Sequence, residues 1–117
     1  NDKSAENIIN MKGVTSNFYF KDDTTLIITS DQGQYNNKTL DMVFIGNIKA
    51  IYQGSELYAE RAEYYNGQNF LMVSEDVKIV DFRGTMNADK LIIDIAKQKI
   101  DISSLNNKKI NANVSLK

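Results

Sequence analysis

The chain has 117 residues and a formal net charge of −1, from 14 basic and 15 acidic residues, so no basic surface for nucleic acid is expected. It contains no His and no Cys, which excludes most zinc, haem, iron–sulfur and nucleophilic-triad chemistry. With 42% hydrophobic residues it is apolar enough to fold as one domain over residues 1–117, of which residues 1–7 are predicted to be disordered.

The first half of the chain reads as a series of β-strands. Residues 8–20 are expected to form a long strand with Val14, Phe18 and Phe20 on one side. Residues 24–34 form a β-branched second strand, and a turn at residues 36–38 leads into the segment TLDMVFI. That segment is apolar on both faces, as expected of a strand that is central or that faces a ligand.

Residues 57–82, LYAERAEYYNGQNFLMVSEDVKIVDF, form the clearest unit of the sequence. Two alternating strands are separated by Asn66-Gly67, a pair typical of a two-residue hairpin turn, and a tight link at residues 74–76 leads to a third strand. About thirty residues earlier the same frame recurs with one deletion, and Gly46-Asn47 is read there as a turn. It recurs again about thirty residues later, from Met86. A fixed period of this size predicts about three stacked repeats.

The apolar alternation changes face once in each repeat, next to Asp31, Arg61 and Lys90. In the first repeat, for example, the inward phase is predicted to run through Ile27 and Thr29 before the change. An odd step in a period of two is what a β-bulge leaves in a sequence. The strands are therefore predicted to bend at a common level, giving an all-β, V-shaped double sheet with an apolar trough between its halves.

The inner positions of the repeats are aliphatic, aromatic and methionine side chains, which form an adaptable apolar wall. They could equally form a plain dry core. The residues predicted to face the trough are Leu40, Met42, Phe44, Ile48, Leu57, Ala59, Phe70, Met72, Val77, Ile79, Met86, Ala88, Ile100 and Ile102.

Nothing in the sequence identifies a catalytic or metal site. A glycosidase-like pair such as Glu60 with Asp89 is conceivable, but such carboxylates are more simply outward strand positions. No calcium-loop spacing is present, and no cofactor is expected. The last segment, INANVSL, alternates cleanly and carries no charge, and the chain has no proline to blunt its edges.

Three segments resemble the repeat of the OstA/LptA/LptC superfamily of lipopolysaccharide-transport proteins. They are SDQGQYNNKTLDMVFIGNIKA, AERAEYYNGQNFLMV and ADKLIIDIAKQKIDI, and together the resemblance covers roughly residues 12–116. The family repeat has the form A-D-x-L-x-Y-D, a turn, an apolar pair and G-N-V. Gly46-Asn47-Ile48 matches the last element, whereas Ile93 stands where Tyr is usual.

The resemblance implies an open, twisted antiparallel β-jellyroll whose trough holds the acyl chains of lipopolysaccharide, at about 0.8 kcal/mol per buried methylene. The short chain and its long opening strand look most like the LptC branch, which relays lipopolysaccharide from an inner-membrane transporter. The implied location is the periplasm, with a tether to the inner membrane by an N-terminal helix missing from this chain. An LptA-type soluble bridge protein and a structural repeat that polymerises by its edges, with a dry core, remain alternatives.

The resemblance also implies partners at the two ends of the sheet. The bridge protein LptA would pair at the C-terminal edge, formed by Ile110, Ala112, Val114 and Leu116. The transporter subunits LptF/LptG would pair at the N-terminal edge, near Val14, Phe18 and Phe20. A homodimer is left open.

Overall fold

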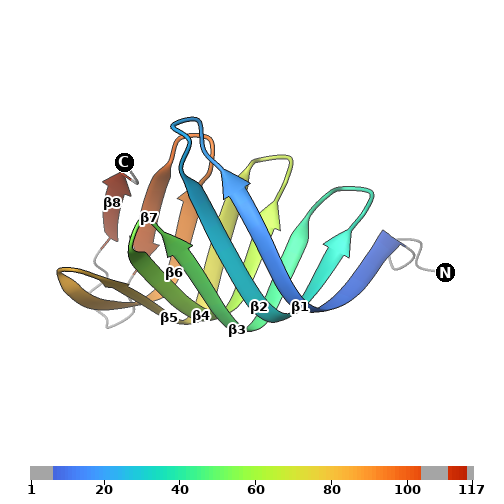
Figure 1. The fold of residues 1–117 in the computed structure, drawn as a ribbon, viewed down its shortest axis with the longest axis horizontal. Helices are drawn as coiled ribbons and strands as arrows, with labels where there is room; N and C mark the ends of the chain where they lie inside the picture. Colours follow the sequence, from blue (N-terminus) through green and yellow to red (C-terminus); the bar gives the residue numbers. More distant parts are fainter. Residues whose placement is uncertain (1–6, 104–110, 116–117) are drawn as a thin grey trace.

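A computed structural model describes residues 7–103 and the backbone of residues 111–115, and it shows a single antiparallel sheet. The described strands follow one another across this sheet in chain order, from β1 to β8 (Figure 1). The strands are β1 (Ile8–Tyr19), β2 (Thr25–Asn36), β3 (Met42–Tyr52), β4 (Ser55–Tyr65), β5 (Phe70–Asp81), β6 (Gly84–Asp94), β7 (Lys99–Ser103) and β8 (Asn111–Ser115). The all-β, antiparallel prediction is confirmed. The segment predicted to be disordered lies outside the described residues except for Asn7.

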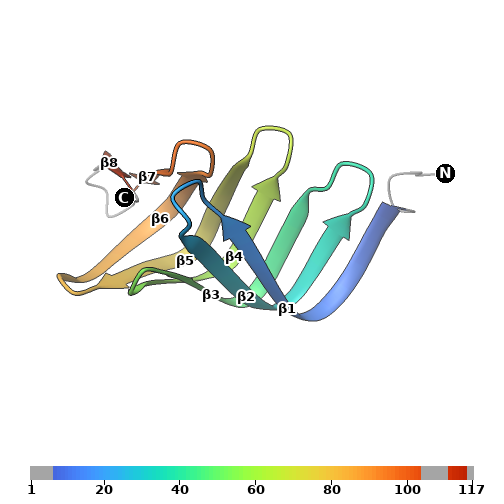
Figure 2. The same cartoon turned by 45° about the horizontal axis from the view of Figure 1, so that its top comes forward.

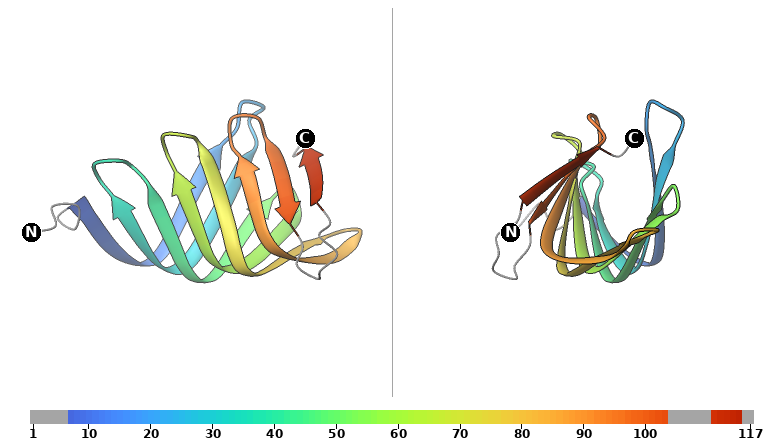
Figure 3. Two further views of the ribbon diagram at one scale, coloured as in Figure 1. Left: turned by 180° about the vertical axis from the view of Figure 1, so that it is seen from behind. Right: turned by 90° about the vertical axis from the view of Figure 1, so that its left-hand side faces the viewer.

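The sheet folds over along a line through the middle of its long strands, as the curved ribbons of Figure 2 show. Seen end on, it is trough-shaped (Figure 3, right). We call the two halves the first wall and the second wall. The first wall comprises residues 14–19, 25–30, 48–52, 55–59, 77–81 and 84–88. The second wall comprises residues 8–12, 32–36, 42–45, 61–65, 70–74 and 90–94, together with β7 and β8.

The bend is produced by two bulges on alternate strands. Gly46 and Asn47 in β3 have φ values of 84° and 46°, and Glu75 and Asp76 in β5 have φ values of 69° and 58°. At these points the register shifts between β3 or β5 and both neighbouring strands. Consecutive residues in the left-handed region turn the strand without ending it.

These shifts lie within two residues of Asp31, Arg61 and Lys90, which confirms the predicted bend positions. One expectation was wrong, because Gly46-Asn47 is not a turn between two strands. Strand β3 runs through it, and the side-chain amide of Asn47 donates a hydrogen bond of 2.7 Å to Asp31 Oδ2. The carboxylate next to the bend thus holds the bulged residue in place.

The hairpin after β4 also differs from expectation. Asn66-Gly67 was predicted to form a two-residue turn, but the connection runs from Asn66 to Asn69, and the positive φ, 56°, belongs to Asn69. The Asn69 N–H donates to the Tyr65 carbonyl over 2.8 Å, which closes a wider turn.

The core fills the space between the walls. Its largest fully buried side chains are Ile28, Phe44, Ile48, Leu71, Val73, Val77 and Leu91. Each side chain of this kind contributes roughly 1.5–3 kcal/mol when it leaves water. Gly33 is needed where the walls meet, because a Cβ there would lie 2.9 Å from both the Met42 and the Val14 side chains.

Candidate functional site

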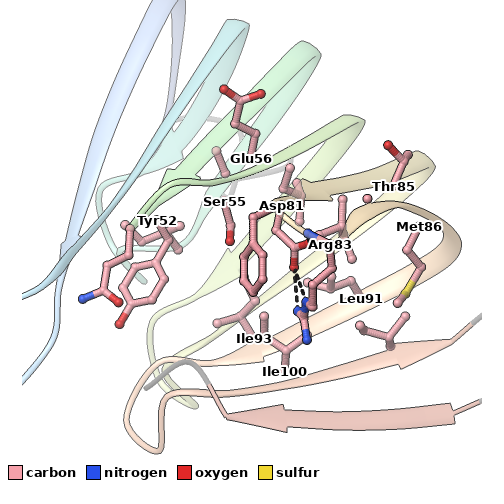
Figure 4. A pocket seen from close by; sticks show the side chains of 18 residues that line it. Tyr52, Ser55, Glu56, Asp81, Arg83, Thr85, Met86, Leu91, Ile93 and Ile100 are labelled. Carbon is pink, nitrogen blue, oxygen red and sulfur yellow. Dashed lines mark hydrogen bonds and ion pairs between the residues drawn. The ribbon is translucent and has the colours of Figure 1, made fainter.

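An open pocket of about 670 Å³ lies between the two walls, in the part of the trough formed by β2 to β7 (Figure 4). Its apolar lining comes from both walls, because inward side chains of β2 to β6 on one side face those of β6 and β7 on the other. These residues include Leu26, Ala50, Leu57, Ile79, Met86, Leu91, Ile93, Ile100 and Ile102. A mostly apolar pocket with few polar groups is suited to a hydrophobic ligand.

The polar part of the lining belongs to strand ends and turns. Asp81 and Arg83, at the β5–β6 turn, form an ion pair of 2.6 Å, drawn with dashed lines in Figure 4. Hydrogen bonds from the Arg83 side chain hold the pKa of the Asp81 carboxyl below its usual value. Between them, Phe82 is 95% exposed at the tip of the turn. The pocket therefore has an apolar floor and a charged rim.

The part of the trough nearer the N-terminal strand is filled instead of open. The rings of Phe18 in β1 and Tyr64 in β4 meet across it with centroids 4.9 Å apart. Below them, Phe44 has no exposed surface, and Val14 is only 7% exposed. We call these four side chains the plug. None of them lines the open pocket.

A hydrogen-bonded contact joins the two walls at the border between plug and pocket. Gln98, in the β6–β7 turn, donates from Nε2 to Asp22 Oδ2 in the β1–β2 turn over 3.2 Å and to the Tyr52 hydroxyl over 3.4 Å. The Tyr52 hydroxyl also lies 2.9 Å from Thr24 Oγ1. We call Asp22, Thr24, Tyr52 and Gln98 the clasp.

The sequence-predicted inner residues fall into three groups. Leu57, Ile79, Met86, Ile100 and Ile102 line the open pocket. Met42, Phe44, Ile48, Ala59 and Val77 are buried core residues between the walls, and Ala88 packs against that core.

The third group was placed wrongly. Phe70 and Met72 lie on the outer face, because alternation in β5 buries Leu71 and Val73 instead, and Met72 is paired with Glu63 on β4. Leu40 does not belong to a strand, since β3 begins at Met42, and its side chain is 44% exposed in the preceding turn.

The inward phase of β2 was also misassigned. Leu26, Ile28 and Ser30 are the buried positions before the bend, whereas Ile27 is 38% exposed on the outer face. The sequence predicted the position of the bend in β2 correctly, but it assigned the inward residues of β2 to the wrong face of the sheet.

Sequence reasoning missed several pocket residues, of which Leu91 and Ile93 were nonetheless visible as the inward phase of the third repeat. The sequence pattern did not indicate a role for Tyr52 or Gln98. A tyrosine at a strand end and a glutamine in a turn are common, and their contact forms only when the two walls come together. Gln98 is only 5% exposed.

The residues predicted for the N-terminal edge have side chains that face inward. Val14 and Phe20 are buried, and Phe18 packs against the core, so a partner at this edge would pair with the backbone of β1. Strand β1 is nevertheless the first strand of the sheet. Ala112 and Val114 lie in β8, the last described strand, and Ile110 and Leu116 lie outside the described residues.

The carboxylates weighed as a catalytic pair lie at the bend. Glu60 is exposed there, accepts a hydrogen bond from the Asn47 N–H over 3.3 Å, and does not line the pocket. Within residues 7–103 and 111–115, no group of His, Cys, Asp and Glu side chains could hold a metal ion. In the same residues no helix is long and apolar enough to cross a membrane.

Comparison with known proteins agrees with this geometry. The crystal structure of LptH from Pseudomonas aeruginosa, described as the LptA-homologous periplasmic component of the lipopolysaccharide transport device, is similar with a TM-score of 0.56 and 11% identity. The match covers 97% of this chain and 98% of that one. No curated protein sequence matches the chain.

The fold is therefore an open β-jellyroll of the kind found in a periplasmic lipopolysaccharide-transport component. The family model described as "Lipopolysaccharide-assembly, LptC-related" matches residues 2–107. The chain belongs to this LptC-related family, whose members are periplasmic lipopolysaccharide-transport proteins and not a known class of enzymes.

Proposed function

We propose that the chain accepts lipopolysaccharide from an inner-membrane transporter and relays it along an edge-to-edge β-bridge toward the outer membrane. The observation that carries this proposal is the open apolar pocket between the walls, with Met86 47% exposed on one wall and Ile100 partly exposed on the other. Exposed apolar side chains inside a concavity cost free energy in water, and that cost is removed when acyl chains cover them.

In the proposed direction of relay, lipopolysaccharide enters on the N-terminal side of the sheet and leaves on the β8 side. The N-terminal side of the sheet, with β1 at its edge, would face LptF/LptG, and the β8 side would face LptA. Both contacts would form by strand addition, because an edge strand offers a row of backbone N–H and C=O groups. A tether at the N-terminal end would keep the protein beside the transporter.

A photo-crosslinking amino acid placed in the pocket tests the proposal. We expect Met86 and Ile100 replaced by such a residue to capture lipopolysaccharide in cells that run the transport pathway. The matched control is Met72, a methionine of the outer face of β5, together with Lys78 on the outer face of the first wall. Equal capture at the pocket and the control positions would contradict the assignment of the pocket as the lipid site.

The alternative of a structural repeat with a dry core has less support. A pocket of about 670 Å³ that remains open between apolar walls is not what a close-packed interior leaves. Native mass spectrometry of gently purified protein distinguishes the two functions, since only the transport function predicts bound lipid.

A further inference from the structure

The trough is divided into a filled part and an open part, and the clasp lies at the border between them. Tyr52 belongs to both features, because its hydroxyl contacts Gln98 and Thr24 while its ring lines the pocket. The same ring packs edge-on against Phe20, with centroids 5.4 Å apart. Any movement of the clasp therefore changes the end wall of the pocket.

The volume of the open part limits what it can hold. A methylene group needs about as much room as a water molecule, roughly 30 Å³. The 670 Å³ pocket then shelters on the order of twenty methylene groups, or about two acyl chains of ten to twelve carbons. To stay sheltered between the walls, additional chains would need the neighbouring part of the trough, which the plug occupies.

At the clasp, Gln98 Nε2 donates hydrogen bonds across the walls to the Asp22 carboxylate and to the Tyr52 hydroxyl. A side-chain hydrogen bond contributes little net stability compared with the burial of the core, so these bonds can open while the walls stay folded. The clasp joins residues that are 76 and 46 positions apart in the sequence, so no local strand pairing is lost when it opens. The two walls join at the bend, where β3 and β5 carry their bulges.

We propose that the closed trough is a site for about two acyl chains, and that release of the Asp22–Gln98–Tyr52 clasp is required before a lipid with more chains can be accommodated. This inference rests on the proposed function and specifies how the number of acyl chains on the bound lipid determines whether the clasp opens. A two-chain phospholipid would bind without opening the clasp. Multi-chain lipid A would bind only to the open form, in which the plug separates and the trough becomes continuous.

The test uses a covalent lock across the clasp. The chain has no Cys, so Asp22→Cys with Gln98→Cys places the only two thiols in the protein. A short bifunctional thiol reagent is used to join them in place of a direct disulfide. In the clasp the ends of the Asp22 and Gln98 side chains are in contact, whereas a disulfide needs the two Cα atoms themselves to be close. The same variant without reagent is the released form. Thr29→Cys with Lys49→Cys, on paired outer positions of β2 and β3, is the matched control.

Binding of two probes is then measured, dilauroyl phosphatidylglycerol, whose two chains have twelve carbons each, and hexa-acyl lipid A. We expect the locked protein to bind the two-chain lipid as the released form does, and to bind lipid A at least tenfold more weakly. Linking the control pair should change neither affinity. Equal binding of lipid A by the locked and released forms would overturn the inference and leave the proposed function intact. Failure of even the released and unaltered proteins to bind lipid A would instead contradict the proposed function.

A second measurement follows the walls directly. Spin labels at Lys21→Cys and Lys97→Cys, two exposed positions beside the clasp, report the separation of the β1–β2 and β6–β7 turns. Lipid A should lengthen this separation and the two-chain lipid should not. An unchanged separation with lipid A bound would show that the clasp stays closed, and the inference would fail.

Discussion

At the scale of single residues, the burial of an apolar side chain, and not its hydrophobicity alone, determines how much it stabilises the fold. Phe44 and Phe82 are chemically identical, yet Phe44 has no exposed surface between the walls and Phe82 is 95% exposed at a turn. The alternation around Phe44 predicted its inward position correctly, with Met42 and Phe44 in the same phase. The outward Phe82 and Met72 could not be distinguished from core residues by type alone.

Replacing Phe44 by alanine should destabilise the protein by about 3–5 kcal/mol, the usual cost of removing a buried phenylalanine and leaving a cavity. Replacing Phe82 by alanine should cost less than about 1 kcal/mol, since only an exposed ring above the Arg83 guanidinium is lost. Chemical denaturation of both variants measures the difference. Similar costs for the two substitutions would mean that the walls do not pack around Phe44 as described.

At the scale of strands, the bend could be predicted from sequence but the register within a repeat could not. Tyr35 pairs with Met42 and, 29 residues later, Tyr64 pairs with Leu71, so the repeat is constant and needs no deletion. Aligning the turns by their asparagines instead shifted β5 by one residue. A shift of one residue moves every side chain to the opposite face, which is why Phe70 and Met72 were assigned to the trough.

The bulge itself is specified by backbone conformation. Gly46→Ala should destabilise the protein by about 1–2 kcal/mol, because an L-residue is strained in the left-handed region, which Gly46 occupies at φ 84°, and its Cβ would lie 3.3 Å from Asp31 Oδ2. Gly67→Ala is the control, since nothing lies within 4 Å of a Cβ there. Thermal or chemical denaturation compares them. Equal stability of the two variants would show that the bulge at Gly46 is not required for the bend.

At the scale of the whole molecule, one sheet forms the core, the candidate lipid pocket and both edges. Among the described residues, the walls pack against each other near the N-terminal strand and separate where the pocket lies. The sequence indicated a trough but could not show that part of it is filled, because packing across the walls joins residues such as Phe18 and Tyr64 that are remote in the chain. Tertiary contacts of this kind leave no periodic signal.

The two ends of the sheet should be separable by truncation. Strand β8 pairs only with β7 among the described strands, over five residue pairs, whereas the core lies between β1 and β7. Deleting residues 110–117 should therefore leave a folded domain with its pocket, and β7 would become the last strand. Because the bridge protein LptA is expected to add a strand at this end, its binding should be lost, while docking to LptF/LptG through the β1 side should persist.

Pull-down with purified LptA and, separately, with the membrane transporter measures both contacts. The full chain carrying Lys78→Ala on the outer face of the first wall is the control, since it alters the surface but neither edge. Circular dichroism verifies that the truncated domain is folded before binding is compared. If the truncated domain still bound LptA as tightly as the full chain does, the bridge protein would have to dock at the β1 edge, and the proposed direction of relay would be reversed.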